Sequence, residues 1–281
     1  MSTSGSNGKL TSGMAAAPRA SMSNARPTAV VTGASSGVGV DFARELAGRG
    51  YDLVLTARRM ERLEAVRAEL LRDYDVHVDL LASNLNSRQG AERLHADVCR
   101  LGRPVRLLVN NAGMGKFGSF LDQSLDDVEA MIQLNTVSLT VLAHLFAADF
   151  RQQGLGFILN HASFSALQPP PLYSVYAGTK AYVLAFSQAL HQDLRRDGIR
   201  VSALCPGFFT SEFLAKANQQ PSSIVKLIML PSTRVARAGI RGVLRGKPVI
   251  IPGVGYNFLN LLLRFLPRSF ATGLAYFAFK H

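Results

Sequence analysis

Residues 28–39 read TAVVTGASSGVG. This stretch decides the fold, because a run rich in β-branched residues leads directly into a glycine-rich turn. Gly33, Gly37 and Gly39 allow a tight turn and let the backbone approach a pyrophosphate group. The helix expected from Gly37 would offer free N–H groups and the positive end of its dipole. The spacing is G-x-x-x-G-x-G, and an ordinary strand–helix turn is the alternative. We interpret the stretch as a dinucleotide-binding turn.

The rest of the chain alternates strand-like and helix-like segments from this turn onward. We expect strands at Thr28–Thr32, Asp52–Thr56, Val76–Ala82, Val105–Asn110, Gly156–Asn160, Ile199–Leu204 and Pro248–Ile251. Helices are expected at Gly37–Gly50, Arg59–Arg72, Arg88–Arg100, Leu125–Phe150, Tyr173–Arg196 and Pro231–Leu244. This rhythm predicts an α/β fold, a Rossmann-type doubly wound parallel sheet of about seven strands with helices on both faces. Residues 28–281 are predicted to form one domain.

The charge of the chain is concentrated at its two ends. The formal net charge is +12, but residues 28–212 carry 18 basic and 19 acidic side chains. Residues 213–281 carry ten basic side chains and no acidic one. Residues 1–27 lack an apolar signal region and are rich in Ser, Ala and Gly, so we expect a disordered tail, with an organelle-targeting segment as the alternative. Two cysteines without metal-ligand spacing predict no metal site and a reducing, cytoplasmic location.

The end of the second predicted strand indicates which dinucleotide binds. NAD-binding turns place an acidic residue there for the ribose 2′-hydroxyl, but this chain has Arg58 and Arg59. A guanidinium group suits a 2′-phosphate through charge-assisted hydrogen bonds, and the Ser35 hydroxyl in the turn adds a donor. We therefore predict NADP, although two solvated arginines at a helix start are the alternative.

Tyr176 and Lys180 are the strongest chemical signal, since residues four apart lie on the same face of a helix. We expect the ammonium group and an oxidised nicotinamide to lower the phenol pKa from its usual value of about 10, so that Tyr176 can act as a general acid or base. Ser163 follows the fifth strand and can donate to a developing alkoxide. Asn135 lies in mid-helix, where Asn is disfavoured, so either a role in the site or a core hydrogen bond is expected.

These motifs resemble those of the short-chain dehydrogenase/reductase family over residues 28–252. The resemblance rests on Thr32-Gly33 with Gly37 and Gly39, Asn110-Asn111-Ala112-Gly113, Asn135, Ser163, Tyr176 with Lys180, and Pro206-Gly207. It implies a catalytic tetrad in which Tyr176 transfers the proton, Ser163 polarises the carbonyl, Lys180 holds the nicotinamide ribose and Asn135 positions a water. The implied cofactor-binding residues are Gly33, Ser35, Ser36, Gly37, Val38, Gly39, Arg58, Asn84, Leu85, Asn110, Ala112, Gly113, Tyr176, Lys180, Pro206, Phe209 and Ser211.

Two residues depart from the family pattern. Asn84 stands where the family usually has the Asp that holds adenine, so adenine binding is expected to be weaker. His161 stands two residues before Ser163, where a small or apolar residue is commoner. We interpret His161 as a structural or pocket-lining residue.

The C-terminal third is apolar as well as basic, with bulky stretches at Ile224–Leu230, Tyr256–Leu263 and Phe270–Phe279. We predict that residues 213–281 form a substrate lid and a basic apolar extension for a lipophilic carbonyl substrate. Peripheral membrane contact and a subunit interface of a homo-oligomer are two further hypotheses for this segment. Nucleic-acid binding is not expected, because the aromatics are not interleaved with Arg or Lys.

The sequence thus predicts an NADP(H)-dependent enzyme that interconverts a ketone or aldehyde and an alcohol by hydride transfer. The lipophilic substrate is expected to be acyl, steroid-like or terpenoid, and a small polar carbonyl compound is the alternative. A rival of another class is a non-catalytic NADP-binding protein that responds to redox state. The intact Ser163, Tyr176 and Lys180 favour the enzyme.

Overall fold

The structure, a computed structural model, describes residues 26–210, 228–263, 265, 266 and 273. The predicted disordered tail therefore lies outside the described residues except for its last two positions. Ser211, predicted to bind the cofactor, also lies outside them.

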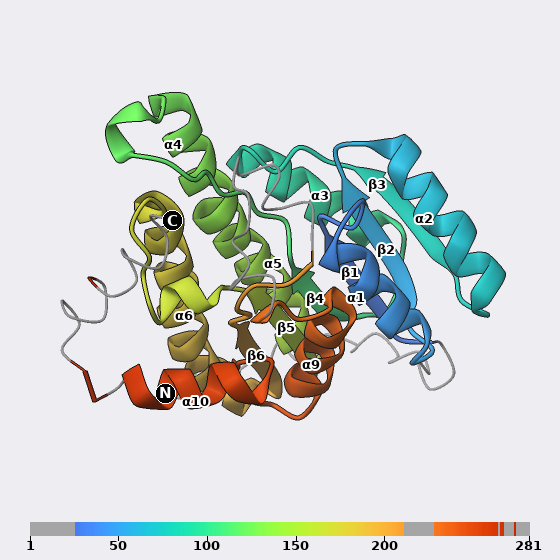
Figure 1. Cartoon of the computed structure of the whole chain (residues 1–281). Coiled ribbons are helices and arrows are strands. Elements are labelled where there is room, and N and C mark those ends of the chain that lie inside the picture. The colour runs from blue at the N-terminus through green and yellow to red at the C-terminus, as the bar shows by residue number, and fades with distance from the viewer. Residues whose placement is uncertain (1–25, 211–227, 264, 267–272, 274–281) are drawn as a thin grey trace, which may run out of the picture.

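Seven parallel strands form one sheet in the order β3-β2-β1-β4-β5-β6-β7, which confirms the predicted fold class (Figure 1). The strands are β1 Thr28–Thr32, β2 Asp52–Ala57, β3 Val78–Ala82, β4 Val105–Asn110, β5 Gly156–His161, β6 Ile199–Leu204 and β7 Val249–Ile250. The strand order reverses between β1 and β4. In open parallel sheets, ligands bind at such a switch point, outside the carboxyl ends of the strands.

Two groups of helices bury the two faces of the sheet (Figure 1). One face packs against α1 Val38–Ala47, α2 Met60–Asp73 and α9 Ser232–Leu244, with Phe42 and Leu70 among its buried side chains. The other packs against α3 Arg88–Arg100, α5 Leu139–Gln153 and α6 Ser174–Leu194, with Phe146 and Phe150 in its core. Apolar residues at helical spacing on each helix account for both layers.

The predicted helix Leu125–Phe150 is not regular. It consists of α4 Leu125–Ile132, a π-helical turn η2 Gln133–Ser138, and α5. Together Leu125–Gln153 is long and apolar enough to cross a membrane by composition, but in this fold its α5 part covers the sheet and contributes core residues. The turn widens the helix at Asn135, and such turns often occur at functional sites.

Short 3₁₀ segments and one unpredicted helix complete the described chain. The 3₁₀ segments are η1 Phe120–Asp122, η3 Phe164–Ala166 and η4 Arg195–Asp197. The helix α10, Val254–Leu263, follows β7 and comes from a stretch that the sequence marked only as apolar.

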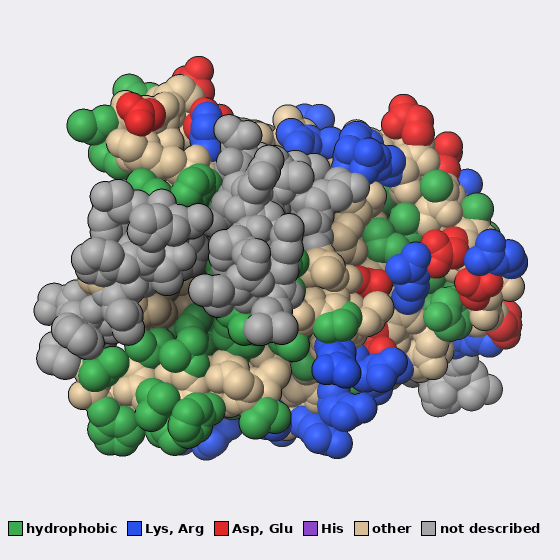
Figure 2. Space-filling view, viewed as in Figure 1, with side chains coloured by type: hydrophobic (Ala, Val, Ile, Leu, Met, Phe, Trp, Pro, Cys, Tyr) green, Lys and Arg blue, Asp and Glu red, His purple; other side chains and the backbone are tan. Residues whose placement is uncertain are grey.

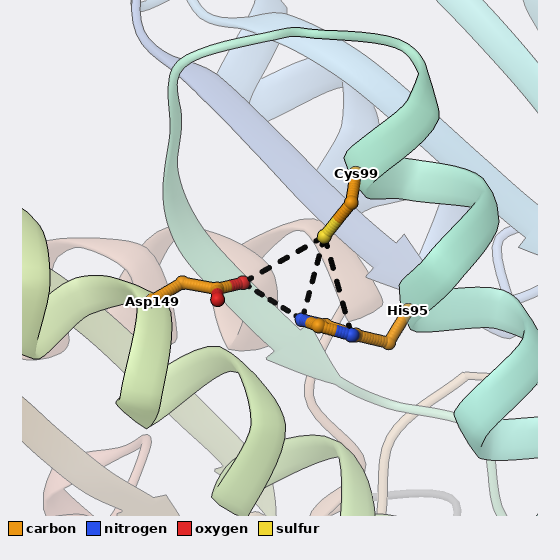
Figure 3. Close-up of side chains that lie close together, drawn as sticks. All are labelled: His95, Cys99 and Asp149. Atoms are coloured by element: carbon orange, nitrogen blue, oxygen red, sulfur yellow. Dashed lines mark hydrogen bonds and ion pairs between the residues drawn. The ribbon is translucent and has the colours of Figure 1, made fainter.

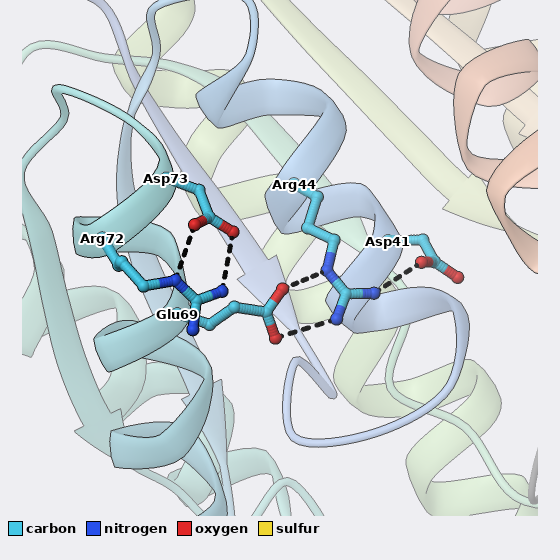
Figure 4. A network of polar contacts seen from close by, with 5 residues as sticks. All are labelled: Asp41, Arg44, Glu69, Arg72 and Asp73. Atoms are coloured by element: carbon cyan, nitrogen blue, oxygen red, sulfur yellow. Dashed lines mark hydrogen bonds and ion pairs between the residues drawn. The ribbon is translucent and has the colours of Figure 1, made fainter.

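An ion network on the surface joins α1 to α2 (Figure 4). The Arg44 guanidinium donates two hydrogen bonds to the Glu69 carboxylate, at 2.6 and 2.9 Å, and a third to Asp41 at 3.0 Å. Arg72 pairs with the neighbouring Asp73. The pairing with Glu69 raises the pKa of Arg44, and the Arg44 hydrogen bond lowers the pKa of Glu69.

Candidate active site

The side chains of Thr32 and Asn111 hold the glycine-rich turn against the end of β4. Thr32 Oγ1 accepts hydrogen bonds from the N–H groups of Asn111 and Ala112, both at 2.9 Å. Asn111 Nδ2 donates to the carbonyls of Thr32 (2.9 Å) and Gly33 (3.3 Å). The first turn of the fold and the end of the fourth strand therefore form one rigid unit at the switch point.

The predicted glycines occupy positions that larger residues do not fit. Gly33 and Gly37 have φ values of +66° and +57°, which are left-handed conformations that favour glycine. A Cβ on Gly39 would lie 2.2 Å from the Gly33 carbonyl oxygen. No side chain caps the N-terminus of α1, so its first N–H groups face the turn.

Asn110, predicted to bind the cofactor, directs its side chain into the core, so only its backbone is left for that role. Asn110 is buried, and its Nδ2 donates to the Asn160 side chain at 3.0 Å and to the Leu139 carbonyl at 3.3 Å. Because side chains alternate along a strand, Asn110 points into the core, and its neighbour Asn111 faces the glycine turn.

Tyr176, Ser163 and Lys180 meet at the carboxyl edge of the sheet, as predicted. Ser163 follows β5 and hydrogen-bonds the Tyr176 hydroxyl through its side chain. Lys180 Nζ lies 5.7 Å from the centroid of the Tyr176 ring. It donates to the His161 carbonyl at 2.6 Å, so the end of β5 fixes the ammonium group.

Asn135 links the π turn to Tyr176, Ser163 and Lys180 mainly through hydrogen bonds to backbone groups. Its Nδ2 donates to the Met114 carbonyl (2.8 Å), and its Oδ1 accepts from the Met114 N–H (2.9 Å). Nδ2 also donates to Thr179 Oγ1 (3.0 Å), which in turn donates to the Tyr176 carbonyl (2.7 Å). A Cβ on Gly113 would lie 3.1 Å from Asn135 Oδ1 and 3.4 Å from Lys180 Nζ. The four predicted catalytic residues are thus brought together.

The electrostatics differ from the expectation for Tyr176. Burial raises the pKa of Tyr176 to about 12, and the Ser163 hydrogen bond lowers it only in part. Burial also lowers the pKa of Lys180 to about 8. Desolvation is the largest cause of the Tyr176 shift, and Lys180 is not among its causes. A phenol pKa lowered by Lys180 together with an oxidised nicotinamide stays a prediction for the cofactor-bound enzyme.

The other predicted cofactor residues lie around the same edge. Arg58 follows β2 and is exposed, with no ion pair to any residue in the described part of the chain. Asn84 is exposed, and its Oδ1 accepts from its own loop at Asn86 N (3.1 Å). Leu85 is buried. The Pro206 carbonyl accepts from Phe164 N at 2.8 Å.

The loop after β6 is tied to the C-terminal segment. Phe209 pairs with Leu230 in a parallel β-bridge, and Phe208 N donates to the Tyr256 hydroxyl at 2.9 Å. A Cβ on Gly207 would lie 2.0 Å from the Tyr256 ring, so glycine is required for this close contact.

The comparisons with known proteins agree with this geometry. The family model for short chain dehydrogenases matches residues 27–222. The chain belongs to the short-chain dehydrogenase family. It is therefore an oxidoreductase that acts on CH–OH and C=O groups.

Individual relatives include enzymes named for lipid and steroid substrates. Very-long-chain 3-oxoacyl-CoA reductase of Bos taurus is 32% identical over 211 residues, covering 72% of this chain and 67% of that protein. Human 17-beta-hydroxysteroid dehydrogenase type 3 is 33% identical over 180 residues, covering 63% of this chain and 57% of that protein. The chain thus spans about three fifths to two thirds of the length of these relatives.

A solved structure supports the architecture in the same way. A short-chain dehydrogenase from Sphingobium yanoikuyae in complex with NADPH is 33% identical, with a TM-score of 0.76. The match covers 86% of this chain and 96% of that one.

In this short-chain dehydrogenase, His161 links the end of β5 to Asn111 beside the glycine-rich turn. Its Nδ1 lies 2.9 Å from Asn111 Oδ1, and the Asn111 amide nitrogen already donates to Thr32 and Gly33. The His161 Nδ1 therefore carries the hydrogen in this contact. Burial, aided by Lys180, lowers the pKa of His161 to about 3, so the ring is neutral. This agrees with the structural interpretation made from the sequence.

Thr32, Asn111 and Thr179 hold the site together, but none of them is among the predicted catalytic or cofactor-binding residues, although Thr32 and Asn111 belong to the family motifs. Thr32 and Thr179 are buried hydroxyl residues beside predicted site residues, which is the signal that could have identified them. The π turn has only a weak signal in the sequence, namely Asn135 at a mid-helix position where Asn is disfavoured.

Proposed function

We propose that this chain is an NADP(H)-dependent oxidoreductase that interconverts a ketone or aldehyde and an alcohol, on a lipophilic substrate. The observation that supports it best is the half-buried Tyr176, whose hydroxyl is bonded to Ser163 and lies beside Lys180 at the carboxyl edge of the sheet.

The residues fit a bound dinucleotide. The uncapped start of α1 and the glycines of the turn leave a cradle that side chains would fill, and this suits a pyrophosphate. When bound, the nicotinamide cofactor supplies or accepts the hydride. Arg58 and Ser35 would hold the 2′-phosphate, and Lys180 the nicotinamide ribose. Gly113 lies so close to Asn135 and Lys180 that a side chain at position 113 would crowd both of them.

The proton is handled by the protein's own groups. In the reducing direction Tyr176 donates its hydroxyl proton to the carbonyl oxygen, while Ser163 donates a hydrogen bond to the same oxygen. The raised pKa keeps the phenol protonated at neutral pH, which is the form that a proton donor needs. Lys180, held by the His161 carbonyl, favours the phenolate that remains. Asn135 and Thr179 fix the backbone at Met114 and Tyr176 around this group.

Aromatic side chains around Tyr176 support a lipophilic substrate. Tyr173 packs against Tyr176 and Phe117, with ring centroids 5.7 and 5.3 Å apart, and Phe164 packs against Tyr256 at 5.3 Å. These rings offer a largely apolar wall to the substrate carbon skeleton. The relatives named for very-long-chain 3-oxoacyl-CoA and for 17-beta-hydroxysteroids support the same substrate class.

Activity with Tyr176→Phe tests the proposal. NADPH oxidation is measured with a panel of 3-oxoacyl thioesters, steroid ketones and small polar carbonyl compounds. Tyr176→Phe should keep NADPH binding and lose about 10²–10⁴-fold in kcat, the usual contribution of general acid catalysis. Tyr182→Phe is the matched control, because Tyr182 lies on the same helix and bonds Thr140 at the surface. Equal rates in Tyr176→Phe and the native protein would remove the proton-transfer role, and no turnover with any carbonyl would favour the non-catalytic rival.

Arg58→Asp tests the choice of NADP. Losing a charge-assisted hydrogen bond costs about 1.5–3 kcal/mol, so NADPH affinity should fall about tenfold to a hundredfold. NADH affinity should change much less. Arg93→Asp, an exposed residue on α3, gives the same change in net charge and should affect neither. An unchanged NADPH-to-NADH ratio in Arg58→Asp would contradict the assignment.

We also infer peripheral contact with an anionic membrane through α10. Its exposed side chains include Phe258, Leu261 and Leu262, and Figure 2 shows apolar side chains gathered over this helix. Lys and Arg side chains lie beside them over and just after α9. The exposed ones include Arg234 and Arg241 on α9, and Arg245 and Lys247 after it. An apolar helix next to cations complements the hydrocarbon boundary and headgroups of such a surface. The location proposed is cytoplasmic with peripheral attachment.

Vesicle co-sedimentation tests the contact. Binding should require phosphatidylserine, weaken in high salt, and fall in Leu261→Ser/Leu262→Ser. Binding to uncharged vesicles alone, or undiminished binding of the variant, would contradict it. Analytical ultracentrifugation of the same two proteins tests the predicted homo-oligomer. If the variant loses self-association but not vesicle binding, then α10 is a subunit interface instead.

A further inference from the structure

Three side chains that can ligate a metal converge between α3 and α5, apart from the site described above (Figure 3). His95 and Cys99 lie four residues apart on α3 and therefore share a face of that helix. Asp149 faces them from α5. Both helices run back from the carboxyl edge of the sheet, so their C-terminal halves lie toward the opposite edge from Tyr176.

The three ligand atoms are close to one another. His95 Nε2 is 2.7 Å from Asp149 Oδ2, and Cys99 Sγ is 3.6 Å from His95 Nε2 and 3.9 Å from Asp149 Oδ2. Packing fixes the histidine, because its ring meets the buried Phe146 ring edge-on, with centroids 5.0 Å apart. Phe146 and Asp149 lie on the same helix, so the core that holds one partner also places the other.

The arrangement differs from a nucleophile–base relay. In such a relay one imidazole nitrogen faces the nucleophile and the other faces the carboxylate. Here Nε2 is the nearer nitrogen to both the thiol and the carboxylate. Burial and Asp149 also raise the pKa of the Cys99 thiol, which is the opposite of activation. Convergence of three ligand types on one point is typical of a metal site.

We propose that His95, Cys99 and Asp149 bind a divalent cation of the zinc class, which joins α3 to α5. Thiolate, imidazole and carboxylate together are a ligand set for zinc and not for Mg²⁺ or Ca²⁺. Tetrahedral zinc holds such atoms about 3.3–3.6 Å apart, given Zn–N and Zn–S bonds of about 2.0–2.3 Å. The sulfur–nitrogen separation already has this value, and the nitrogen–oxygen pair would open by about 0.6 Å as its hydrogen bond is replaced.

Binding requires one local adjustment and one proton release. Sγ is 3.6 and 4.0 Å from the two ring nitrogens, so it lies over the ring and not along the Nε2 lone pair. Rotation about the Cys99 Cα–Cβ bond would bring it to the metal, and the exposure of Cys99 allows this movement. The thiol loses its proton to solvent when the sulfur–metal bond forms. Solvent completes the fourth position.

The cysteine content of the chain allows a clean test on the full-length protein. The chain has two cysteines, and Cys205 is fully buried, so thiol labelling of the folded protein reports on Cys99. One equivalent of Zn²⁺ should slow labelling by at least about tenfold, whereas Mg²⁺ should have no effect. Co²⁺ should give a thiolate-to-cobalt charge-transfer band that Cys99→Ser abolishes.

Variants of the other two ligands decide whether the site is composite. His95→Gln and Asp149→Asn should each weaken Zn²⁺ affinity by at least about tenfold, since losing even an outer-shell partner has that effect. Asp97→Asn, a carboxylate on the same helix that pairs with Arg100, is the control and should bind as the native protein does. Thermal unfolding followed by circular dichroism verifies that each variant is folded. Unprotected labelling in the native protein, or full protection in both ligand variants, would overturn the proposal.

Discussion

Two polar networks of this protein differ in burial, and the difference indicates what each contributes. At the carboxyl edge of the sheet, Thr32, Asn135, Thr179 and Lys180 are buried and bonded largely to backbone groups. Between α1 and α2, Arg44 and Glu69 form a pair of partly exposed ions (Figure 4). A buried polar group left without its partner costs far more than an exposed ion pair contributes. We therefore expect changes at the edge to affect both folding and catalysis, and changes in the ion network to affect neither strongly.

Gly39→Ala should disrupt the buried network at the carboxyl edge of the sheet more than any other change predicted below. The new Cβ would lie 2.2 Å from the Gly33 carbonyl oxygen, so the backbone of the turn has to move. We expect a loss of about 3 kcal/mol or more in the free energy of unfolding, together with loss of NADPH binding. Urea denaturation and fluorescence titration with NADPH measure the two effects. Gly255→Ala is the control, since a Cβ there meets open space. Equal stability of the two variants would show that the turn is not rigid.

Thr179→Val keeps the shape of the edge and removes one hydroxyl. Thr179 Oγ1 donates to the Tyr176 carbonyl and accepts from Asn135. Its loss should cost about 1–3 kcal/mol of stability. It should also lower kcat by up to about tenfold, equivalent to ~1.4 kcal/mol, while KM stays unchanged. Thr179→Ser should restore kcat because it keeps the hydroxyl. If serine does not rescue turnover, Thr179 has only a packing role.

The sequence predicted the elements and residues of the site better than it predicted the hydrogen bonds that join them. Strand and helix positions followed from hydrophobic alternation, and the tetrad followed from residue spacing that resembles one family. The π turn at Asn135 and the inward turn of Asn110 depend on tertiary packing that no local pattern records. The raised pKa of Tyr176 was missed for a related reason, since desolvation depends on how many atoms surround the phenol.

Lowering the pH tests His161, the partly buried histidine of the site. The pKa of His161 is about 3 in the folded protein and 6.5 in an unstructured chain. Between these values the unfolded chain binds a proton that the folded protein does not, so stability falls as the pH falls from about 6.5 toward 3. The slope is at most ~1.4 kcal/mol per pH unit for one proton. His161→Gln keeps an amide donor and cannot titrate, so its stability should fall less steeply. Denaturant titrations at intervals between pH 4 and 7 measure both slopes, and parallel curves would contradict the prediction.

Glu69→Gln tests the other network, the exposed ion pair between α1 and α2. Glu69 receives two hydrogen bonds from Arg44, but both side chains are about a third or more exposed, at 31% and 40%. Exposed pairs are worth about 0.2–1 kcal/mol, and Arg44 keeps its contact with Asp41, so the loss should lie within that range. The effect should shrink in high salt, because screening weakens exposed pairs more than buried hydrogen bonds. Urea denaturation at low and high salt measures it. A loss as large as that of Thr179→Val would mean that geometry, and not burial, sets the strength of polar networks in this protein.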